Sequence, residues 1–309
     1  GAMDSLRFGI ELETVGISRA MLAEAIEREL GGTHNERNGN YAIIAPDGRV
    51  WTVVSDASLS GGIYRSGEVV SPILTVADID LLQRVVRAVR RAGATVDATT
   101  GLHCHVSSDR FDARSITNLV KMVHKNEELL EHALGVTESR KSRYCRPIDP
   151  DFLRRLEASR PQTLEQLSTA WYGVPNTTPY RYHDSRYRAI NLNGYFLRGA
   201  IEIRAFAGSL HAGEVKAYVQ LVLALAAKAI KAKSTSSKRR VFNPATPKYD
   251  FRVLLLQLGM IGPEYKTARL HLTKKLAGSS AWKGERRDRR IRPQPAAPSD
   301  PIASVPAAA

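Results

Sequence analysis

The sequence predicts a single domain of the α+β class, with short strands, amphipathic helices and no internal repeat. Runs in which apolar and polar side chains strictly alternate predict half-buried strands. Longer segments with apolar residues three and four positions apart predict helices that pack on one side. The sequence has 309 residues and is 43% hydrophobic, which is ordinary for a chain that buries one large core.

The N-terminal third of the chain predicts four strands and two helices. Residues 6–13 alternate in polarity, and the helix that follows has an N-cap signal at Ser18 and a stop signal at Gly31. A Pro-Asp-Gly turn at 46–48 is typical of a hairpin. The expected elements are a strand at 6–13, a helix at 18–30, hairpin strands at 41–45 and 49–54, a strand at 67–71 and a helix at 76–91.

The rest of the chain predicts three more strands among several helices. Residues 102–106 alternate in polarity, and strands at 187–193 and 200–206 form a hairpin linked through glycines. Residues 138–146 are basic and irregular, and residues 173–185 are rich in turn formers and aromatic side chains. The expected helices are 115–134, 151–157, 164–171, 212–231, 251–258 and 264–276, and residues 233–247 have the composition of a linker.

The ends of the chain are expected to lie outside the domain. The leading Gly-Ala-Met is typical of a remnant left by an expression vector, so residues 1–5 are set aside. The expected domain covers 6–278, with its motifs in 6–232 and a helical extension in 250–278, and residues 279–309 form a disordered tail rich in basic residues, Pro and Ala. No apolar stretch is long enough to suggest a membrane span.

The two cysteines and the net charge give weaker indications. Cys104 and Cys145 fit neither a disulfide framework nor a metal-ligand spacing, which favours a cytoplasmic location. The formal charge of +14 would attract phosphate-bearing partners. Much of it lies in the runs 228–240 and 283–292, which are expected to be solvated, so nucleic-acid binding through the basic tail stays an open alternative.

Pairs of charged side chains two positions apart mark three of the expected strands. Residues two apart on a strand share a face, so Glu11 and Glu13 lie about 7 Å from each other. Two partly buried carboxylates need a neutralising cation, and oxygen ligands favour Mg²⁺, Mn²⁺ or Ca²⁺. Glu68, on a short apolar strand, is a further candidate ligand. The alternative is a solvent-facing strand that its glutamates keep soluble.

The other two pairs are His103 with His105 and Glu202 with Arg204. Two histidines that share a face can bind a transition metal, donate to phosphate or exchange protons near neutral pH. The alternative for Glu202 and Arg204 is a surface ion pair of little energetic value. If the three strands share one concave sheet, their charges converge on a single cleft.

Four further residues are candidate contacts for triphosphate oxygens or a substrate carboxylate: Arg140, Arg143, Arg188 and Asn191. The chain has no P-loop, no dinucleotide-binding glycine motif and no nucleophile elbow. A nucleotide would therefore be held by magnesium that bridges carboxylates and phosphates.

The segments 8–13, 67–72, 101–106 and 201–206, in this order and spacing, resemble the putative amidoligase family. That family belongs to the carboxylate–amine ligase superfamily of glutamine synthetase and glutamate–cysteine ligase, and the resemblance spans about residues 6–232. It implies a curved, mostly antiparallel sheet of the glutamine synthetase-like type, flanked by helices. It also implies ATP and two or more magnesium ions in the concave cleft.

The resemblance also implies roles for the candidate residues. By the resemblance, Glu11, Glu13, Glu68 and Glu202 are expected metal ligands, Arg204 would stabilise the transferring phosphoryl group, and His103 or His105 would contact metal or phosphate. Together with the candidates chosen from residue type, the expected catalytic residues are Glu202, Arg204 and Arg188, and the expected nucleotide contacts are His103, His105, Asn191, Arg140 and Arg143. Which histidine meets metal or phosphate stays open, because both face the same way. The residues 172–187 are the expected substrate-facing loop.

The implied reaction is the ATP- and magnesium-dependent formation of an amide from a carboxylate and an amine, through an acyl phosphate. The acid and the amine would be small molecules, peptides or polymers. One alternative is phosphotransfer on the same scaffold without amide formation. Another is a nucleic-acid-binding or degenerate scaffold protein.

Overall fold

The computed structural model describes residues 1–283, which are organised around one open sheet. Its strands lie in the order β2-β3-β4-β5-β1-β6-β8-β7, and every neighbouring pair is antiparallel. The strands are β1 (Phe8–Val15), β2 (Thr33–Arg37), β3 (Asn40–Ile44), β4 (Val50–Val54), β5 (Ser66–Val70), β6 (Gly101–Ser107), β7 (Ile190–Asn191) and β8 (Ala200–Ala207). The predicted mixture of helices with an antiparallel sheet is therefore confirmed.

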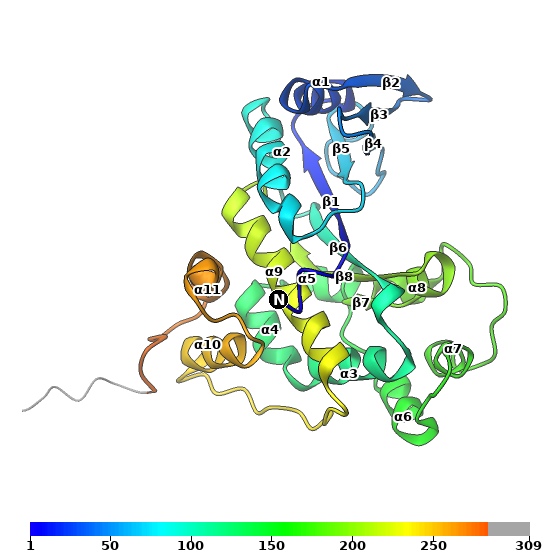
Figure 1. The fold of residues 1–309 in the computed structure, drawn as a ribbon, viewed down its shortest axis with the longest axis vertical. Coiled ribbons are helices and arrows are strands. Elements are labelled where there is room, and N and C mark those ends of the chain that lie inside the picture. The colour runs from blue at the N-terminus through cyan, green and yellow to red at the C-terminus, as the bar shows by residue number, and fades with distance from the viewer. Residues whose placement is uncertain (284–309) are drawn as a thin grey trace, which may run out of the picture.

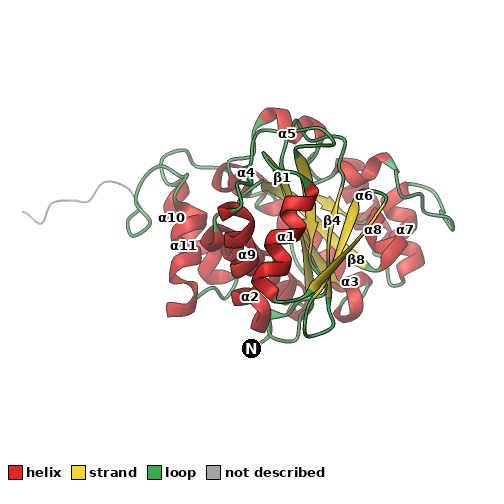
Figure 2. Ribbon diagram, turned by 90° about the horizontal axis from the view of Figure 1, so that it is seen from above, coloured by secondary structure: helices red, strands yellow, loops and turns green. Residues whose placement is uncertain are grey.

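Helices flank the sheet on both sides. The helices are α1 (Arg19–Leu30), α2 (Ile79–Arg91), α3 (Ala113–Lys125), α4 (Glu127–Leu134), α5 (Glu138–Arg143), α6 (Pro150–Ser159), α7 (Leu164–Tyr172), α8 (Asn193–Arg198), α9 (Ala212–Lys231), α10 (Pro247–Gln257) and α11 (Lys266–Thr273). Seen from above, α1, α2 and α9 lie on one side of the strands, and α6, α7 and α8 lie on the other (Figure 2). Strand β1 runs through the middle of the molecule, between α1 with β2–β5 at one end and α3, α6 and α7 at the other (Figure 1).

The apolar face of the central strands is buried under α1 and α9. Ile10, Leu12 and Cys104 are almost fully buried on this face. Phe206 of β8 stacks on Tyr218 of α9, with ring centroids 4.5 Å apart. One continuous core extends along the chain from Leu6 to Leu276. The opposite face of the same strands is left to polar side chains, as alternation requires.

Helix α1 begins where its cap signal predicts. Ser18 has extended backbone angles, and its Oγ accepts the N–H of Met21 at 3.2 Å. Gly31 ends the helix with a φ of 74°, a conformation that glycine adopts without strain. We expect Ser18→Ala to lower the free energy of unfolding by about 1 kcal/mol, because a donor of the first turn loses its acceptor. Urea denaturation measures this, and an equal loss in the cap-preserving control Ser18→Asp would contradict the role of the cap.

Three predicted elements differ from the structure, and one strand was not predicted. The helix expected at 115–134 is broken at Asn126, whose side-chain amide donates to the carbonyl of Met122 and competes with the helical bonds. The predicted strand at 187–193 shrinks to β7, and α8 follows it directly. The basic segment contains the short helix α5. The sequence analysis missed β2, because all five of its residues are exposed and show no alternation in polarity.

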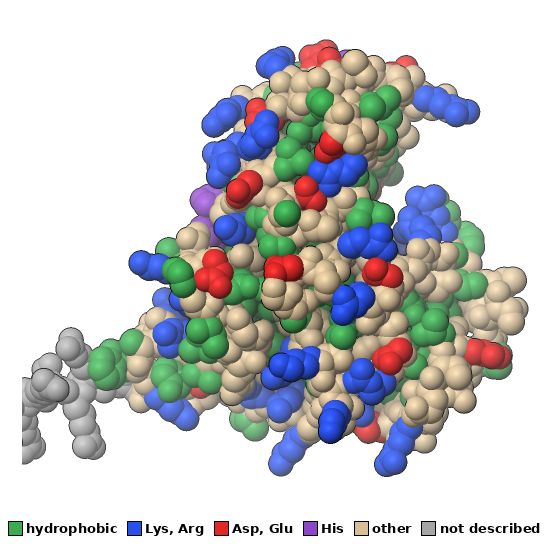
Figure 3. All heavy atoms as spheres, in the orientation of Figure 1, with side chains coloured by type: hydrophobic (Ala, Val, Ile, Leu, Met, Phe, Trp, Pro, Cys, Tyr) green, Lys and Arg blue, Asp and Glu red, His purple; other side chains and the backbone are tan. Residues whose placement is uncertain are grey.

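Of the two basic runs, 228–240 lies within the described residues, whereas 283–292 lies almost entirely outside them. Residues 233–246 contain no helix or strand, as a linker predicts, but Arg239 and Arg240 are bonded to Glu127 and Asn126. On the face drawn in Figure 3, Lys and Arg side chains are spread out with Asp and Glu among them. The predicted tail lies outside the described residues from position 284 onward. Among the described helices, none has the length and apolar character that a membrane crossing requires.

Candidate active site

A row of charged side chains crosses the polar face of five adjacent strands. Within each strand these side chains are an even number of residues apart, so they all point to the same face of the sheet. The register joins them pairwise across β5, β1, β6, β8 and β7: Glu68 with Glu13, Glu11 with His103, His105 with Glu202, and Glu202 with Asn191. Residues far apart in the sequence are therefore brought side by side by backbone pairing alone.

A β-bulge in β8 shapes the end of this row. Cys104 is paired with Ile203 and Leu102 with Phe206, so β8 has one residue more than β6 over this stretch. In a regular strand, Phe206 would share the face of Glu202. The extra residue turns Phe206 into the core, while Arg204 stays on the polar face beside Glu202.

The row forms the floor of a cleft with a volume of about 680 Å³. Acidic and basic side chains both line it in number. The carboxylates are Glu11, Glu13, Asp56, Glu68 and Glu202, and the arginines are Arg140, Arg181, Arg186, Arg198 and Arg204. Five of the six side chains in the three charged pairs line this cleft, as predicted, and the sixth, His105, lies beside it against Glu11.

The acidic side chains, with one histidine, form two groups that each suit a cation. In the first group, ligand atoms of Glu11, His105 and Glu202 lie within 4.8 Å of one another. In the second group, ligand atoms of Glu13, Asp56 and Glu68 do the same. The second group offers only oxygen atoms, the donors that Mg²⁺, Mn²⁺ and Ca²⁺ prefer. The first group adds an imidazole nitrogen, which Mn²⁺ also accepts.

His103 lies between the two groups. Its Nδ1 is 3.1 Å from Glu11 Oε2 and 3.4 Å from Glu202 Oε1, and its Nε2 is 4.0 Å from Glu13 Oε1. His105 Nε2 is 3.0 Å from Glu11 Oε1. The two histidines that looked equivalent in the sequence therefore have different surroundings: His105 belongs to one group, and His103 contacts both.

The electrostatics of the first group favour charged carboxylates. Burial alone would raise the pKa of Glu11, but its bonds with His103 and His105 outweigh this and hold the pKa well below its usual range. Burial would also raise the pKa of Glu202, and Arg204 with the two histidines lowers it instead. These carboxylates are therefore ionised at neutral pH.

In the second group, positive neighbours do not outweigh the effect of burial on the carboxylate pKa values. Burial, followed by repulsion from Glu11, Glu13 and Asp56, raises the pKa of Glu68 well above its usual range. Burial also raises the pKa of Glu13, against the attraction of His103. Carboxylates crowded in this way are what a divalent cation would neutralise, so the donor set fits a metal ion.

Neighbouring residues hold the ligands in place. Glu202 receives hydrogen bonds from Arg204 Nη1 at 2.6 Å and Asn191 Nδ2 at 2.8 Å. Arg140 is buried and donates to the carbonyls of Thr100 and Phe206, so it fixes the backbone behind the cleft. Hydrogen bonds therefore orient Glu202 and the backbone behind the cleft without any ligand.

Close packing also favours a glycine at position 101, because a side chain there would displace its neighbours. The N–H of Gly101 donates to Glu13 Oε2 at 3.1 Å. A Cβ atom at Gly101 would lie 3.0 Å from Arg140 Nη2 and 3.2 Å from His103 Nε2. The bare backbone at this position lets Glu13, His103 and Arg140 meet.

Two predicted contacts lie elsewhere. Arg143 is exposed on α5 and does not line the cleft. Arg188 Nη1 donates to the carbonyl of Pro147 at 2.9 Å, also outside the cleft. Arg188 and Asn191 are three positions apart, so an extended chain points them to opposite faces, and it is Asn191 that faces the cleft. The position of Arg188 does not support the predicted catalytic role.

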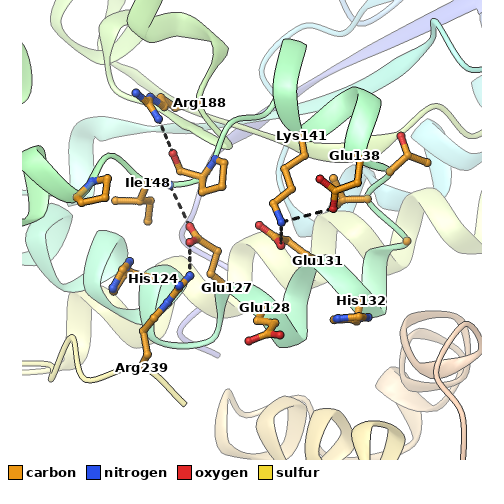
Figure 4. A pocket seen from close by; sticks show the side chains of 15 residues that line it. His124, Glu127, Glu128, Glu131, His132, Glu138, Lys141, Ile148, Arg188 and Arg239 are labelled. Atoms are coloured by element: carbon orange, nitrogen blue, oxygen red, sulfur yellow. Dashed lines mark hydrogen bonds and ion pairs between the residues drawn. The ribbon is translucent and has the colours of Figure 1, made fainter. Parts of the chain in front are cut away.

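Arg188 instead lines a second cavity of about 810 Å³ (Figure 4). The charges of this cavity largely satisfy one another. Glu127 pairs with Arg239 at 2.6 Å, and Lys141 pairs with Glu131 at 2.8 Å. We therefore assign the candidate site to the smaller cleft. There, within residues 1–283, Glu13, Asp56 and Glu68 lie close together with no Arg or Lys side chain within ion-pair distance.

Asp56 and Arg198 were not predicted, and Arg181 and Arg186 were predicted only as part of the substrate-facing loop. Asp56 lies in the loop after β4, and β4 is the neighbour of β5, the strand that carries Glu68. The position of an acidic residue just after this strand was the one feature of the sequence that could have indicated its role. The loop predicted to face the substrate does reach the cleft. It contributes Arg181, Tyr182, Arg186 and Tyr187 to the lining.

Comparison with known families agrees with the motifs on these strands. The model of a family described as putative amidoligase enzyme matches residues 4–226, which include every residue of both candidate cation groups. None of the curated protein sequences matches the chain significantly. The matched region covers most of the chain and all strands of the sheet. The chain therefore belongs to the family described as putative amidoligase enzymes, which are ligase-type enzymes.

Proposed function

We propose that this protein is an ATP- and magnesium-dependent carboxylate–amine ligase whose catalytic sheet is of the glutamine synthetase-like type. The observation that carries the proposal is the pair of adjacent cation-binding groups on one sheet face, with the buried Arg204 beside them. The family match supports a ligase, and the cleft supplies what phosphoryl transfer requires: cation ligands and a fixed guanidinium.

The two groups of ligands would hold the ions. Glu11, His105 and Glu202 would bind one, and Glu13, Asp56 and Glu68 the other. Magnesium bound there would offset negative charge on the nucleotide phosphates. His103, which contacts both groups, would keep Glu11 and Glu202 oriented and donate toward a phosphate oxygen.

The proposed chemistry has two steps. An oxygen of the substrate carboxylate attacks the γ-phosphorus of ATP, the bond to the β-phosphate oxygen breaks, and ADP leaves. The amine nitrogen then attacks the acyl carbon, the carbon–oxygen bond to phosphate breaks, and the nitrogen loses a proton as inorganic phosphate leaves. Arg204, held by Glu202 and by the carbonyl of Tyr144, would stabilise charge on the transferring phosphoryl group.

The acyl group does not need to pass through a cysteine. Cys104 points into the core, on the opposite face from His103 and His105. Burial raises the pKa of the Cys104 thiol and that of Cys145, so neither is a ready nucleophile. The burial of both cysteines supports the proposal of an acyl phosphate, which requires no covalent bond between substrate and protein.

Hydroxylamine trapping tests this function. Hydroxylamine takes the place of the amine and converts an acyl phosphate into a hydroxamate, which ferric iron detects by colour. A collection of metabolite acids and peptides would be incubated with the protein, ATP and magnesium. We expect at least one acid to give hydroxamate and ADP in equal amounts. A stable phosphorylated acid with no hydroxamate would contradict the proposal and indicate a phosphotransferase.

Asp56→Asn tests the second cation group, which includes a residue the sequence did not reveal. We expect the apparent magnesium affinity to fall about 10- to 100-fold, because one of three oxygen ligands loses its charge. Calorimetric titration with Mn²⁺ or Mg²⁺ measures the change. Asp80→Asn, at an exposed position on α2, is the control and should leave the affinity unchanged. The same affinity in Asp56→Asn as in the control would remove Asp56 from the site.

A further inference from the structure

One wall of the cleft carries a ladder of alternating guanidinium groups and aromatic rings. Arg204 Cζ lies 5.7 Å from the ring centroid of Tyr187, and Arg186 Cζ lies 4.5 Å from the same ring. Arg186 is also 5.0 Å from the ring of Tyr182, and Arg181 is 5.6 Å from that ring. We call these five residues the arginine ladder. Stacking on rings holds each guanidinium in a fixed position.

The ladder leads from the buried floor to the mouth of the cleft. Arg204 is largely buried beside Glu202, Arg186 is half-buried, and Arg181 is exposed. All three line the same cleft. A ligand that extends from the floor toward solvent would therefore pass along successive guanidinium groups.

Only the inner end of the ladder is neutralised. Arg204 pairs with Glu202 at 2.6 Å. Within residues 1–283, neither Arg181 nor Arg186 has a carboxylate within ion-pair distance. Arg186 donates to the hydroxyl of Tyr187, a neutral partner, and its buried Nε has no hydrogen-bond partner among the described residues. Unpaired positive charges that lie near one another raise the free energy of the protein, and a bound anionic ligand would lower it.

We propose that Arg186 and Arg181 form a subsite for a second carboxylate of the acid substrate. The substrate would then be a dicarboxylate or acidic peptide that carries a negative charge besides the carboxylate that is phosphorylated. This inference rests on the proposed ligase function, which places the reacting carboxylate next to Arg204. A planar guanidinium stacked on a ring presents its N–H edge, which binds a carboxylate through two hydrogen bonds.

Nucleotide phosphate is the other source of negative charge. Phosphates of a magnesium–nucleotide complex are chelated by the cations, and both cation groups lie at the carboxylate floor. Arg181 and Arg186 have no carboxylate of the cleft within ion-pair distance among the described residues. The cations would hold the phosphates at the floor, whereas Arg181 is exposed at the outer end of the ladder, and this favours the acid substrate as the source of an anion there.

The test measures binding to the full chain loaded with magnesium and a non-hydrolysable ATP analogue. The probes are succinate, glutarate and an acidic dipeptide, each matched with a counterpart that lacks the second carboxylate. We expect the best dicarboxylate to bind at least about tenfold more tightly than its counterpart in calorimetry, as two charge-assisted hydrogen bonds warrant. Arg186→Gln should remove this preference and leave the affinity for the ATP analogue within about twofold. The control Arg37→Gln, on exposed β2, should change neither value.

Three outcomes would overturn the subsite. One is the absence of any preference for the second carboxylate in the unaltered protein. Another is a preference that survives in both Arg186→Gln and Arg181→Gln. The third is a large loss of affinity for the ATP analogue in Arg186→Gln, which would assign the ladder to phosphate. Failure of hydroxamate formation with every acid, while the ATP analogue still binds, would count against the ligase function alone.

Discussion

Glu11→Gln is expected to lower the rate of hydroxamate formation by at least about 10³-fold, the loss found when a group that stabilises charge in a transition state is removed. Glutamine has the size of glutamate but lacks its charge, so the shape of the cleft is kept. Glu11 belongs to the first cation group and contacts both His103 and His105. Its replacement would therefore remove a proposed metal ligand and the partner of two histidines at once.

Two measurements separate this effect from misfolding. Circular dichroism and urea unfolding should show a folded Glu11→Gln protein, since the substitution preserves volume at a half-buried position. Glu165→Gln, at an exposed site on α7, serves as the matched control and should keep full activity. Full activity in Glu11→Gln would remove the first cation group from the mechanism.

Arg204→Lys is expected to lower kcat by about 10²- to 10³-fold, with a smaller change in the affinity for ATP. Lysine keeps the positive charge beside Glu202, so the buried carboxylate is not left unpaired. It lacks the fork of N–H groups with which Arg204 holds both Glu202 and the carbonyl of Tyr144. The loss should therefore appear in the chemical step.

The choice of lysine matters for this test. Arg204→Gln would leave Glu202 buried without its cation, at a cost of about 3–5 kcal/mol in stability. Loss of activity in that variant would not distinguish catalysis from unfolding. A normal kcat in Arg204→Lys, measured under saturating ATP, would show that Arg204 only positions Glu202.

The floor of the cleft could be predicted from the sequence because it is built on strands. Alternation with a period of two put Glu11 beside Glu13 and His103 beside His105 before their pairing was known. Which residues lie opposite each other on neighbouring strands depends on the register, so the pairing of Glu13 with Glu68 is known only from the structure. The sequence therefore shows which side chains of one strand share a face, but it does not show which residues of neighbouring strands lie opposite them.

The loop 172–187 was predicted to face the substrate, but the individual side chains that form the wall of the cleft could not be predicted, because they lie in loops. Asp56 and Arg186 reach the site through the path of irregular segments, which no periodicity encodes. Arg188 was predicted to act in the cleft from its residue type, although its distance of three positions from Asn191 already indicated opposite faces. The break at Asn126 likewise depends on a side-chain hydrogen bond within an otherwise continuous helical pattern.

Calorimetric titration with a non-hydrolysable ATP analogue, with and without magnesium, tests the central claim most directly, because it requires no knowledge of the acid or the amine. We expect binding that is at least about tenfold tighter with magnesium than with a chelator, and a loss of this difference in Glu11→Gln. Equal affinity under both conditions, or no binding at all, would contradict a magnesium–nucleotide site in the carboxylate cleft.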